Sequence, residues 1–406
     1  MTHELVSLRN LHVFASVAAT GSITRSADLL FRAQSAVTRS IHDLEQQLGV
    51  ALFERKARGM LLNEFGRLVL KRTRRIEEEL SAGQYELAMP SRQSSSALHL
   101  QVLMNERRLQ TFVELTDHHH LATVAALRGV TRAAISASVH ELESQLKARL
   151  FERSAKGLLP SDAGLRLAFR ARRALSELRV VPQDIAAMRG TMEGTVTIGA
   201  LPLARTVLLP QAIASLVSQH PRLRVRTIES PYEMLVSQLL AGDLDFIIGA
   251  LRTITDDDDL QTESLFVEPI SIIARKAHPL AQKRRITARD LSKASWALSR
   301  QGSPTRDLIA HSLAKMQLNV PSPMVETGDL AILRGLLLHS DMITAISPQQ
   351  MRYEIDNGSL VVLNYRLEFT NRDIGMTTRR GNMASPGADL LFQKIRGIVD
   401  EISAGQ

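Results

Sequence analysis

Apolar residues recur every three or four positions along residues 8–87, which is the spacing of helices that bury one face. Three helices are expected, with buried positions at Leu11, Phe14, Val17 and Ala18, then Ala27, Leu29 and Leu30, then Ala36, Val37, Ile41, Leu44 and Leu48. Ser22 is suited to cap the second helix and Gly49 to end the third. Residues 51–63, ALFERKARGMLLN, have strand-like ends around a basic tip, and a long charged helix over residues 65–87 follows. Two short helices at a turn, followed by a two-stranded wing, predict a winged helix-turn-helix.

This pattern occurs a second time in the chain. HDLEQQLGVALFER at residues 42–55 returns as HELESQLKARLFER at residues 140–153. The match extends without a gap from Leu11/Leu109 to Leu80/Leu178, at a constant offset of 98 positions. Such self-similarity indicates a duplicated domain of about 80 residues. We refer to residues 11–80 as repeat 1 and to residues 109–178 as repeat 2.

Domain boundaries follow from these patterns. The first winged helix-turn-helix with its long helix occupies residues 1–87, and the second occupies residues 105–190. Residues 88–104 between them include AMPSRQSSSA, a small and polar stretch that is typical of a flexible tether. The second long helix begins near Ala163, and Pro182 is expected to kink or break it before it resumes.

From Thr195 onward, apolar strands alternate with amphipathic helices, which predicts parallel β-α-β layers. Alternating units that return late in the chain suit two α/β lobes joined by crossing strands. Lobe I is expected over residues 191–268 and 368–403, and lobe II over residues 269–367. A ligand cleft between the lobes would lie beyond the carboxyl ends of the strands. The predicted fold class is therefore two mainly-α winged helix-turn-helix domains followed by an α/β two-lobed domain over residues 191–406.

Composition narrows the class of protein. No stretch approaches the ~18–20 apolar residues that a membrane span requires. The opening MTHELVSLRNLHVF does not resemble an export signal, so a cytoplasmic protein is expected. With no cysteine in the chain, a disulfide framework, a thiolate metal site and a cysteine nucleophile are excluded.

The net charge of +8 is unevenly distributed along the chain. Residues 1–83 contain 12 Lys and Arg against 9 Asp and Glu, residues 105–190 contain 14 against 9, and residues 191–406 contain 23 of each. The excess positive charge thus lies in the N-terminal half, which favours a polyanion partner there. An excess of this size is common on small helical domains, so charge alone does not decide the function.

Repeat 1 resembles the DNA-binding domain of LysR-type transcriptional regulators. The resemblance rests on LRNLHVF, GSIT, ADLL, on QSAVT at the start of the third helix, and on LEQQLGVALFER. In the C-terminal half, EGTVTIGAL, LLPQAIASLVSQHPRLRV and LLAGDLDFIIGALR resemble the effector domain of the same family. This implies a periplasmic-binding-protein-like effector domain. The departure from the family is repeat 2, because ordinary members carry one DNA-binding domain.

The resemblance implies that the third helix of repeat 1 reads base edges with its N-terminal residues. Gln34 suits adenine, and Arg39 suits guanine or phosphate. The candidate DNA-binding residues of repeat 1, including those near the wing, are Gln34, Ser35, Thr38, Arg39, Arg55, Lys56 and Arg58. For Arg55 a structural pair with Glu54 or Glu45 is an alternative.

Repeat 2 differs at these positions, with Arg132 for Gln34, Ala133 for Ser35, Ser136 for Thr38 and Ala137 for Arg39. Two interpretations follow: either repeat 2 reads a different base pattern, or it has lost direct readout and serves dimerisation or spacing. We favour retained DNA contact, because this face stays basic and polar. Its candidate residues are Thr131, Arg132, Ser136, Arg153 and Lys156, and Thr131 is also suited to cap the helix.

Loops after the predicted strands carry the candidate effector-binding residues, which are Pro202, Leu203, Ser230, Tyr232, Arg252, Gly302, Ser303 and Thr327. All but Thr327 lie in loops that resemble effector-binding positions of the family. SRQGSPTRDL resembles a helix N-terminus with hydroxyls, which suits a carboxylate. Arg252 could supply the positive charge, or it could form a hinge or interface salt bridge instead.

Two runs of histidine or aspartate contain residue types that bind metals, but we do not expect either run to form a metal site. DHHH at residues 117–120 lies at a helix connection, where adjacent histidines cannot all converge on one ion. DDDD at residues 256–259 lacks the alternation and the terminal glutamate of a calcium loop. We therefore predict neither a metal nor a cofactor.

The sequence thus predicts a transcriptional regulator that binds double-stranded DNA and responds to a small, anionic metabolite, such as an organic or aromatic acid, or else to a sugar. A homodimer or homotetramer is expected, with the helices at residues 65–87 and 163–181 as candidates for dimer pairing. The alternative is a cytoplasmic small-molecule-binding protein in which the second winged helix serves dimerisation. An enzyme is not expected, because the sequence contains no catalytic constellation, phosphate loop or metal-ligand spacing.

Overall fold

The structure is a computed structural model that describes residues 6–56, 59–88, 96–155, 157–254 and 259–404. It divides into an N-terminal unit of Met1–Gly194 with Leu240–Asp243, and a C-terminal unit of Thr195–Leu239 with Leu244–Gln406. None of the helices in these described ranges combines the length and the apolar character that crossing a membrane requires.

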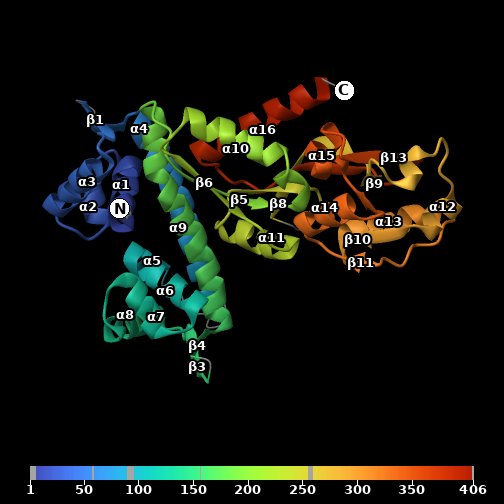
Figure 1. Cartoon of the computed structure of the whole chain (residues 1–406). Coiled ribbons are helices and arrows are strands. Elements are labelled where there is room, and N and C mark those ends of the chain that lie inside the picture. Colours follow the sequence, from blue (N-terminus) through green and yellow to red (C-terminus); the bar gives the residue numbers. More distant parts are fainter. Residues whose placement is uncertain (1–5, 57–58, 89–95, 156, 255–258, 405–406) are drawn as a thin grey trace. The chain divides into compact units, whose positions relative to one another are not determined.

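Six elements build the first half of the N-terminal unit in the order that the sequence predicts (Figure 1). They are α1 (Leu8–Thr20), α2 (Ile23–Leu29), α3 (Gln34–Leu48), β1 (Phe53–Lys56), β2 (Gly59–Leu62) and α4 (Glu64–Ala88). Ser22 caps α2 by accepting a hydrogen bond from the backbone N–H of Arg25. Gly49 ends α3 in the left-handed conformation, with φ of 68°. The predicted cap and stop are therefore confirmed.

The same six elements recur in repeat 2. They are α6 (Glu106–His118), α7 (Leu121–Arg128), α8 (Arg132–Leu146), β3 (Phe151–Ser154), β4 (Gly157–Pro160) and α9 (Asp162–Met188). In each repeat a phenylalanine of the first helix packs on the phenylalanine that opens the hairpin. The ring centroids are 5.3 Å apart for Phe14 and Phe53, and 5.6 Å apart for Phe112 and Phe151. The duplicated sequence thus encodes a duplicated core contact.

Two predicted core positions of repeat 1 are wrong. Leu29 is 65% exposed and Ala36 is also exposed. The buried side of the seven-residue α2 consists of Ser26 and Ala27, so Leu29 at its end points to solvent. On α3 the buried side starts at Val37 and continues at Ile41 and Leu44.

The predicted flexible tether is wrong over part of its length, and the second long helix is not broken at Pro182. Residues 96–103 of the predicted tether form helix α5 (Ser96–Leu103), which packs on α4 and α8 and buries Leu103. α9 continues through Pro182 to Met188. Val181 and Ile185 on either side of this proline are buried, so packing holds the helix together where one backbone hydrogen bond is lost.

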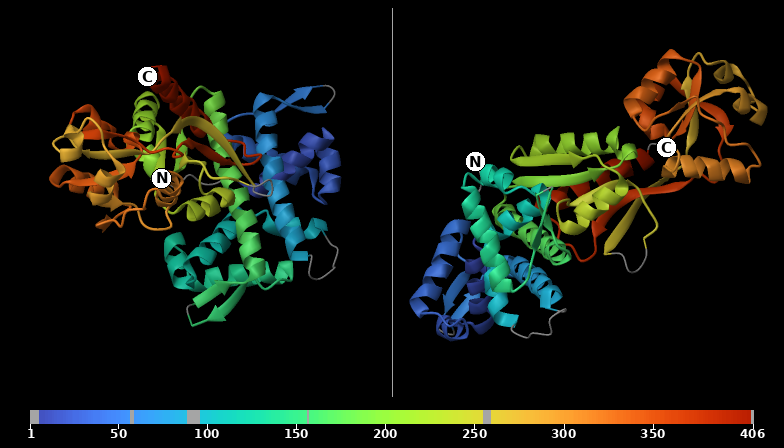
Figure 2. Two further views of the ribbon diagram at one scale, coloured as in Figure 1. Left: turned by 90° about the vertical axis from the view of Figure 1, so that its right-hand side faces the viewer. Right: turned by 90° about the horizontal axis from the view of Figure 1, so that it is seen from below.

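The long helices α4 and α9 lie side by side within the chain, as Figures 1 and 2 show from different directions. One continuous hydrophobic core runs through both repeats, with Val69, Ile76 and Leu80 of α4 and Leu167 and Leu178 of α9 among its members. The two segments that the sequence marked for dimer pairing therefore pair with each other in a single polypeptide.

Two five-stranded sheets form the C-terminal unit, with strand orders β6-β5-β7-β14-β8 and β11-β10-β12-β9-β13. The first sheet contains β5 (Gly194–Ala200), β6 (Leu223–Ile228), β7 (Phe246–Ala250), β8 (Leu260–Glu268) and β14 (Arg372–Arg379). The second sheet contains β9 (Ser271–Arg275), β10 (Ser295–Leu298), β11 (Val325–Glu326), β12 (Met342–Ile346) and β13 (Leu360–Arg366). The chain crosses between the sheets after β8 and after β13, which gives the two-lobed α/β arrangement.

Helices and short 3₁₀ turns connect these strands. The helices are α10 (Leu208–Gln219), α11 (Tyr232–Ala241), α12 (Ala288–Lys293), α13 (Pro304–Lys315), α14 (Leu330–His339), α15 (Arg352–Asp356) and α16 (Pro386–Ala404). The 3₁₀ turns are η1 (Pro202–Arg205), η2 (Pro279–Gln282) and η3 (Pro348–Met351). Both sheets thus alternate strands with helical segments, as the sequence pattern predicts.

The sheets are mixed: the predicted parallel β-α-β pairs are present, but each sheet also contains antiparallel pairs that the pattern did not predict. β5 runs parallel to β7, and β10 runs parallel to β12. β14 runs antiparallel to both β7 and β8, and β9 runs antiparallel to both β12 and β13. β9 and β14 are the strands that follow the two crossings between the sheets. Each of these two strands enters its sheet from the other lobe, so it is antiparallel to both of its neighbouring strands.

Candidate nucleic-acid interface and ligand site

The first turns of α3 present a polar and exposed surface in repeat 1. The four predicted base-reading residues all lie on this exposed side: Gln34, Ser35, Thr38 and Arg39. The Thr38 hydroxyl donates to the carbonyl oxygen of Gln34 at 2.9 Å, and Nε of Arg39 lies 3.8 Å from Asp43. An exposed ion pair this long is weak, so the guanidinium of Arg39 remains available to another anion.

The wing residues of repeat 1 are only partly described. Arg55 and Lys56 lie on β1, opposite Met60 and Gly59 of β2, and their side chains fall outside the description. Arg58 and its counterpart Lys156 in repeat 2 lie outside the described residues.

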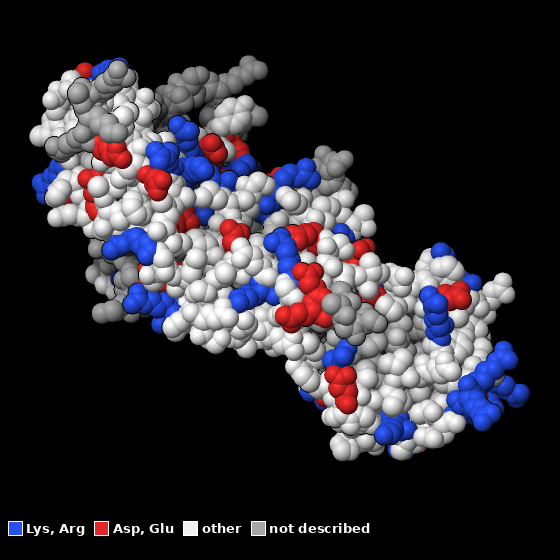
Figure 3. All heavy atoms as spheres, turned by 90° about the horizontal axis from the view of Figure 1, so that it is seen from above, with Lys and Arg blue, Asp and Glu red and all other residues white. Residues whose placement is uncertain are grey.

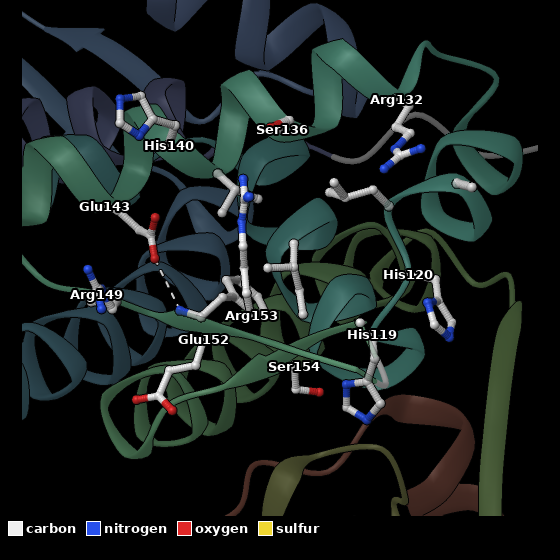
Figure 4. Close-up of a pocket in the computed structure, with 16 residues that line it drawn as sticks. His119, His120, Arg132, Ser136, His140, Glu143, Arg149, Glu152, Arg153 and Ser154 are labelled. Atoms are coloured by element: carbon white, nitrogen blue, oxygen red, sulfur yellow. Dashed lines mark hydrogen bonds between the residues drawn. The ribbon is translucent and has the colours of Figure 1, made fainter.

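In repeat 2 the equivalent surface surrounds a cavity of about 1170 Å³ (Figure 4). Arg132 and Ser136 border it from α8, and Arg153 of β3 projects into it. Thr131 caps α8 by accepting a hydrogen bond from the backbone N–H of Ala134 at 3.2 Å, which confirms its predicted capping role. The structure therefore brings Arg132, Ser136 and Arg153 together around one concavity.

Basic and imidazole groups dominate the lining of this cavity. Besides Arg132 and Arg153 they are Arg149, His119, His120 and His140, and the only carboxylates among the described lining residues are Glu143 and Glu152. Glu143 is occupied, because it accepts hydrogen bonds from the backbone N–H groups of Leu150 at 2.7 Å and Phe151 at 3.1 Å. The arrangement suits phosphate groups of a polyanion. His119 and His140 are not among the residues that the sequence predicts for this site, although His140 repeats His42 of the duplicated motif.

The three histidines of the DHHH run occupy different backbone positions. His118 ends α6, while His119 adopts the left-handed conformation and His120 precedes α7, so the three leave the backbone in different directions. Within the described ranges no three His, Cys, Asp or Glu side chains gather in a way that could hold a metal ion. Residues 256–258 of the acidic run lie outside the described residues.

The predicted ligand-binding residues follow the carboxyl ends of strands. Those after β5, β6 and β7 in the first sheet are Pro202, Leu203, Ser230, Tyr232 and Arg252, and those after β10 and β11 in the second sheet are Gly302, Ser303 and Thr327. The guanidinium carbon of Arg252 lies 4.9 Å from the centroid of the Tyr232 ring, a cation–π contact. The geometry thus pairs the predicted charge with a predicted aromatic neighbour.

Three of these side chains are buried or form hydrogen bonds within the protein. Leu203 is buried in the core. The Ser303 hydroxyl caps α13 at the N–H of Arg306 and lies 3.0 Å from the Ser299 hydroxyl. The Thr327 hydroxyl accepts from the N–H of Asp329 at 3.1 Å. If a ligand bound directly to the hydroxyl group of Ser303 or Thr327, it would have to replace these hydrogen bonds.

The distribution of charged side chains on one face of the protein does not mark out a binding site. On the face drawn in Figure 3, basic and acidic side chains are interspersed over most of the described surface. On this face, a field of one charge sign does not mark a candidate interface.

Comparison with known protein families assigns both the helical repeats and the two-lobed domain. The family described as "LysR substrate binding domain" matches residues 189–398, which is more than half of the chain. The family described as "Bacterial regulatory helix-turn-helix protein, lysR family" matches residues 8–67 and again residues 107–165. The chain belongs to the LysR family. It is a LysR-type DNA-binding transcriptional regulator with a domain for a small-molecule effector.

Relatives of this LysR-type regulator differ in how much of it they cover. The HTH-type transcriptional regulator GalR of Pseudomonas putida strain KT2440 is 42% identical over 98% of this chain and 98% of its own length. GbpR of Azospirillum brasilense is 26% identical over 74% of this chain and 88% of its own. Full-length OxyR from Pseudomonas aeruginosa has a TM-score of 0.55 at 22% identity, over 72% of this chain and 95% of its own. Roughly a quarter of the LysR-type chain thus has no counterpart in the last two.

The repeated glutamate of this LysR-type regulator has a role that the sequence did not reveal. Glu45 accepts a hydrogen bond from the backbone N–H of Leu52 at 2.7 Å, as Glu143 does from Leu150. Each carboxylate thereby holds the start of a hairpin to the preceding helix. Arg55, the predicted partner of Glu45, has a side chain outside the description. The hydrogen bond from a backbone N–H group to the glutamate occurs in both repeats.

Replacing Phe31 with glycine should stabilise the regulator. Phe31 has φ of 51° and is 95% exposed, whereas the equivalent position of repeat 2 is Gly129 with φ of 64°. A left-handed conformation costs a residue with a side chain about 1–2 kcal/mol, and glycine recovers part of this. We expect Phe31→Gly to raise the free energy of unfolding by about 0.5–1 kcal/mol in urea titrations. Gly129→Ala should lower it, and a destabilised Phe31→Gly would contradict the strain argument.

Proposed function

We propose that this regulator binds double-stranded DNA through two winged helix-turn-helix domains, residues 1–87 and 105–190, joined through residues 88–104. The observation that carries the proposal is the exposed reading surface in both repeats, which is polar at Gln34 and Arg39 and basic around Arg132. The two separate matches to the helix-turn-helix family support it. Regulation of transcription in the cytoplasm, without catalysis, is the activity that we propose.

We further propose that a small, anionic metabolite controls DNA binding from the domain at residues 191–406. Lobe I would comprise residues 191–268 and 368–403, and lobe II residues 269–367, in a periplasmic-binding-protein-like arrangement. The cation of Arg252 and the N-terminus of α13 at Ser303 support an anionic ligand. Ligand-driven closure would shift the population of subunit arrangements in a homodimer or homotetramer.

Footprinting of the upstream region of the genes it controls tests DNA binding by both repeats. Two reading domains per chain predict a protected region longer than a single domain pair covers, with a part that responds to Arg132→Ala. The matched substitution in repeat 1 is Gln34→Ala, which should weaken the other part. A single ordinary-length footprint that is unchanged by Arg132→Ala would contradict the proposal.

A dimerisation role for repeat 2 is the second candidate. It is favoured by Ala133 and Ala137, which replace polar residues of α3 with side chains that cannot form hydrogen bonds to base edges. In that case Arg132→Ala and Arg153→Ala would leave DNA affinity unchanged. The basic lining of the cavity makes us favour DNA contact instead.

Arg252→Ala should abolish recognition of an anionic effector. The wild-type chain is screened for thermal stabilisation by organic acids, aromatic acids and sugars, and the variant is tested with every compound that responds. A ligand at 100 times its dissociation constant stabilises by about 2.7 kcal/mol, so loss of the arginine should remove most of the shift. Arg289→Ala, at an exposed arginine of α12, is the matched control. An unchanged shift in Arg252→Ala would show that Arg252 is a structural cation.

A further inference from the structure

The long helices α4 and α9 pair antiparallel inside one chain. Arg72, in the first half of α4, bonds Asp184 near the end of α9. Glu86, near the end of α4, bonds Arg170 in the first half of α9. The same offset of 98 positions that relates the repeats also relates these residues, Arg72 to Arg170 and Glu86 to Asp184.

The ion pairs across α4 and α9 obey an approximate two-fold symmetry. The reciprocal contacts, with their N–O distances, are Arg72–Glu177 (2.7 Å) and Arg170–Glu79 (3.0 Å); Arg72–Asp184 (2.7 Å) and Arg170–Glu86 (2.6 Å); and Arg75–Glu177 (2.7 Å) and Arg173–Glu79 (2.6 Å). The first helices of the repeats also meet, where the N–H of Leu8 donates to its equivalent Glu106 at 3.1 Å. Reciprocal contacts of this kind characterise the interface of a two-fold dimer.

The interface is buried at its centre. The Arg72 side chain is 1% exposed, and Glu177 and Asp184 are 4% and 6% exposed. Burial alone would lower the pKa of Arg72, but the hydrogen bonds and charges of Asp184 and Glu177 raise the pKa above its ordinary value. The guanidinium therefore stays charged and paired, on top of an apolar core that both repeats share. A shared apolar core of this kind is typical of the interface between stably associated subunits.

The two halves of this symmetric scaffold carry different reading residues. Gln34 and Arg39 of α3 correspond to Arg132 and Ala137 of α8. A symmetric homodimer presents two identical helices and therefore matches an operator with two equivalent half-sites. A pair with glutamine on one side and arginine on the other prefers different bases in its two half-sites.

We propose that a single chain is a complete DNA-reading pair, and that its operator unit is a non-palindromic duplex with two unlike half-sites. This inference rests on the proposed DNA binding by both repeats. Further chains associate through other surfaces, because the helix pair that would join two subunits is already satisfied within one.

An engineered disulfide tests whether the pairing is internal to the chain. The chain has no cysteine, so the double variant Gly83→Cys with Arg170→Cys introduces the only two thiols. A Cβ built on Gly83 lies 3.1 Å from Cβ of Arg170, close to the ~3.5–4.5 Å of disulfides. The full-length double variant and both single variants are oxidised, and the products are separated by mass without reductant while free thiols are counted.

Pairing within one chain predicts loss of both thiols at monomer mass, in the double variant alone. Disulfide-linked dimers formed by the double variant beyond those of the single variants would overturn the proposal, because the helices would then pair between chains. Thiols that stay reduced in a chain with native circular dichroism would also overturn it, because α4 and α9 would not be neighbours.

Selection of binding sites from random duplex DNA with the full-length chain tests the operator. We expect two half-sites of different sequence, and we expect binding to fall at least tenfold when either half-site is replaced by the inverted copy of the other. Palindromic sites that bind equally well would refute the asymmetric operator while leaving DNA binding intact. Failure to select any sequence would refute the proposed function itself, and the disulfide result would still decide the pairing of the helices.

Discussion

Arg72→Ala should reduce the free energy of unfolding by about 3–5 kcal/mol, the loss expected when one partner of a buried ion pair is removed. Nε and Nη1 of Arg72 each lie 2.7 Å from a carboxylate, of Asp184 and Glu177 respectively. Without the guanidinium, both carboxylates would remain buried. Arg75 would still contact Glu177, and Asp184 would lose its contact with Arg72. Urea titrations followed by circular dichroism would measure the loss.

The second repeat supplies a matched control for this prediction. Arg170 makes the equivalent contacts to Glu79 and Glu86, but its side chain is 25% exposed. Water can therefore solvate the carboxylates in Arg170→Ala, and the loss should be less than half of that in Arg72→Ala. Equal losses in the two variants would show that burial does not distinguish the two ends of the interface.

The double variant Gln34→Ala with Arg132→Ala should lose about 100-fold or more in affinity for a selected operator. Each well-placed base contact discriminates by about 1–3 kcal/mol, and distant substitutions add. Either single variant should lose about tenfold and relax the base preference only in its own half-site. Fluorescence anisotropy with operator variants at fixed salt concentration would measure both effects.

Arg153→Ala distinguishes base reading from phosphate contact in the same experiment. Arg153 projects from β3 into the cavity of repeat 2, beside the reading helix. Its loss should weaken binding to all sequences alike and lower the salt dependence of the affinity by about one phosphate contact. A sequence-specific loss would instead assign Arg153 to base recognition, and unchanged affinity in both Arg132→Ala and Arg153→Ala would contradict DNA reading by repeat 2.

The sequence alone determined the order and type of the elements in each repeat, together with the start of α2, the end of α3 and the start of α8. Helical periodicity, the Ser22 cap, the Gly49 stop and the suitability of Thr131 as a cap are all visible in residues a few positions apart. They were predictable because such signals are local: a cap bonds a backbone group three residues away. The duplication was also decided by sequence, since it is a comparison of the chain with itself. The strand ends that carry Ser230, Arg252 and Ser303 followed from the same local patterns.

Only the tertiary structure decided which surfaces meet. An apolar and charged helix that pairs within a chain has the same sequence pattern as one that pairs between chains, so the partner of α4 could not be read from its periodicity. Helix α5 escaped prediction because its polar flanks resemble a linker, and burial of Leu103 against both repeats stabilises it. In the sequence, Arg72 is one of several basic residues of the long charged helix. Its position opposite Glu177 and Asp184, more than a hundred residues away, makes it the centre of the interface, because the strength of an ion pair depends on geometry and burial, which are properties of the folded chain.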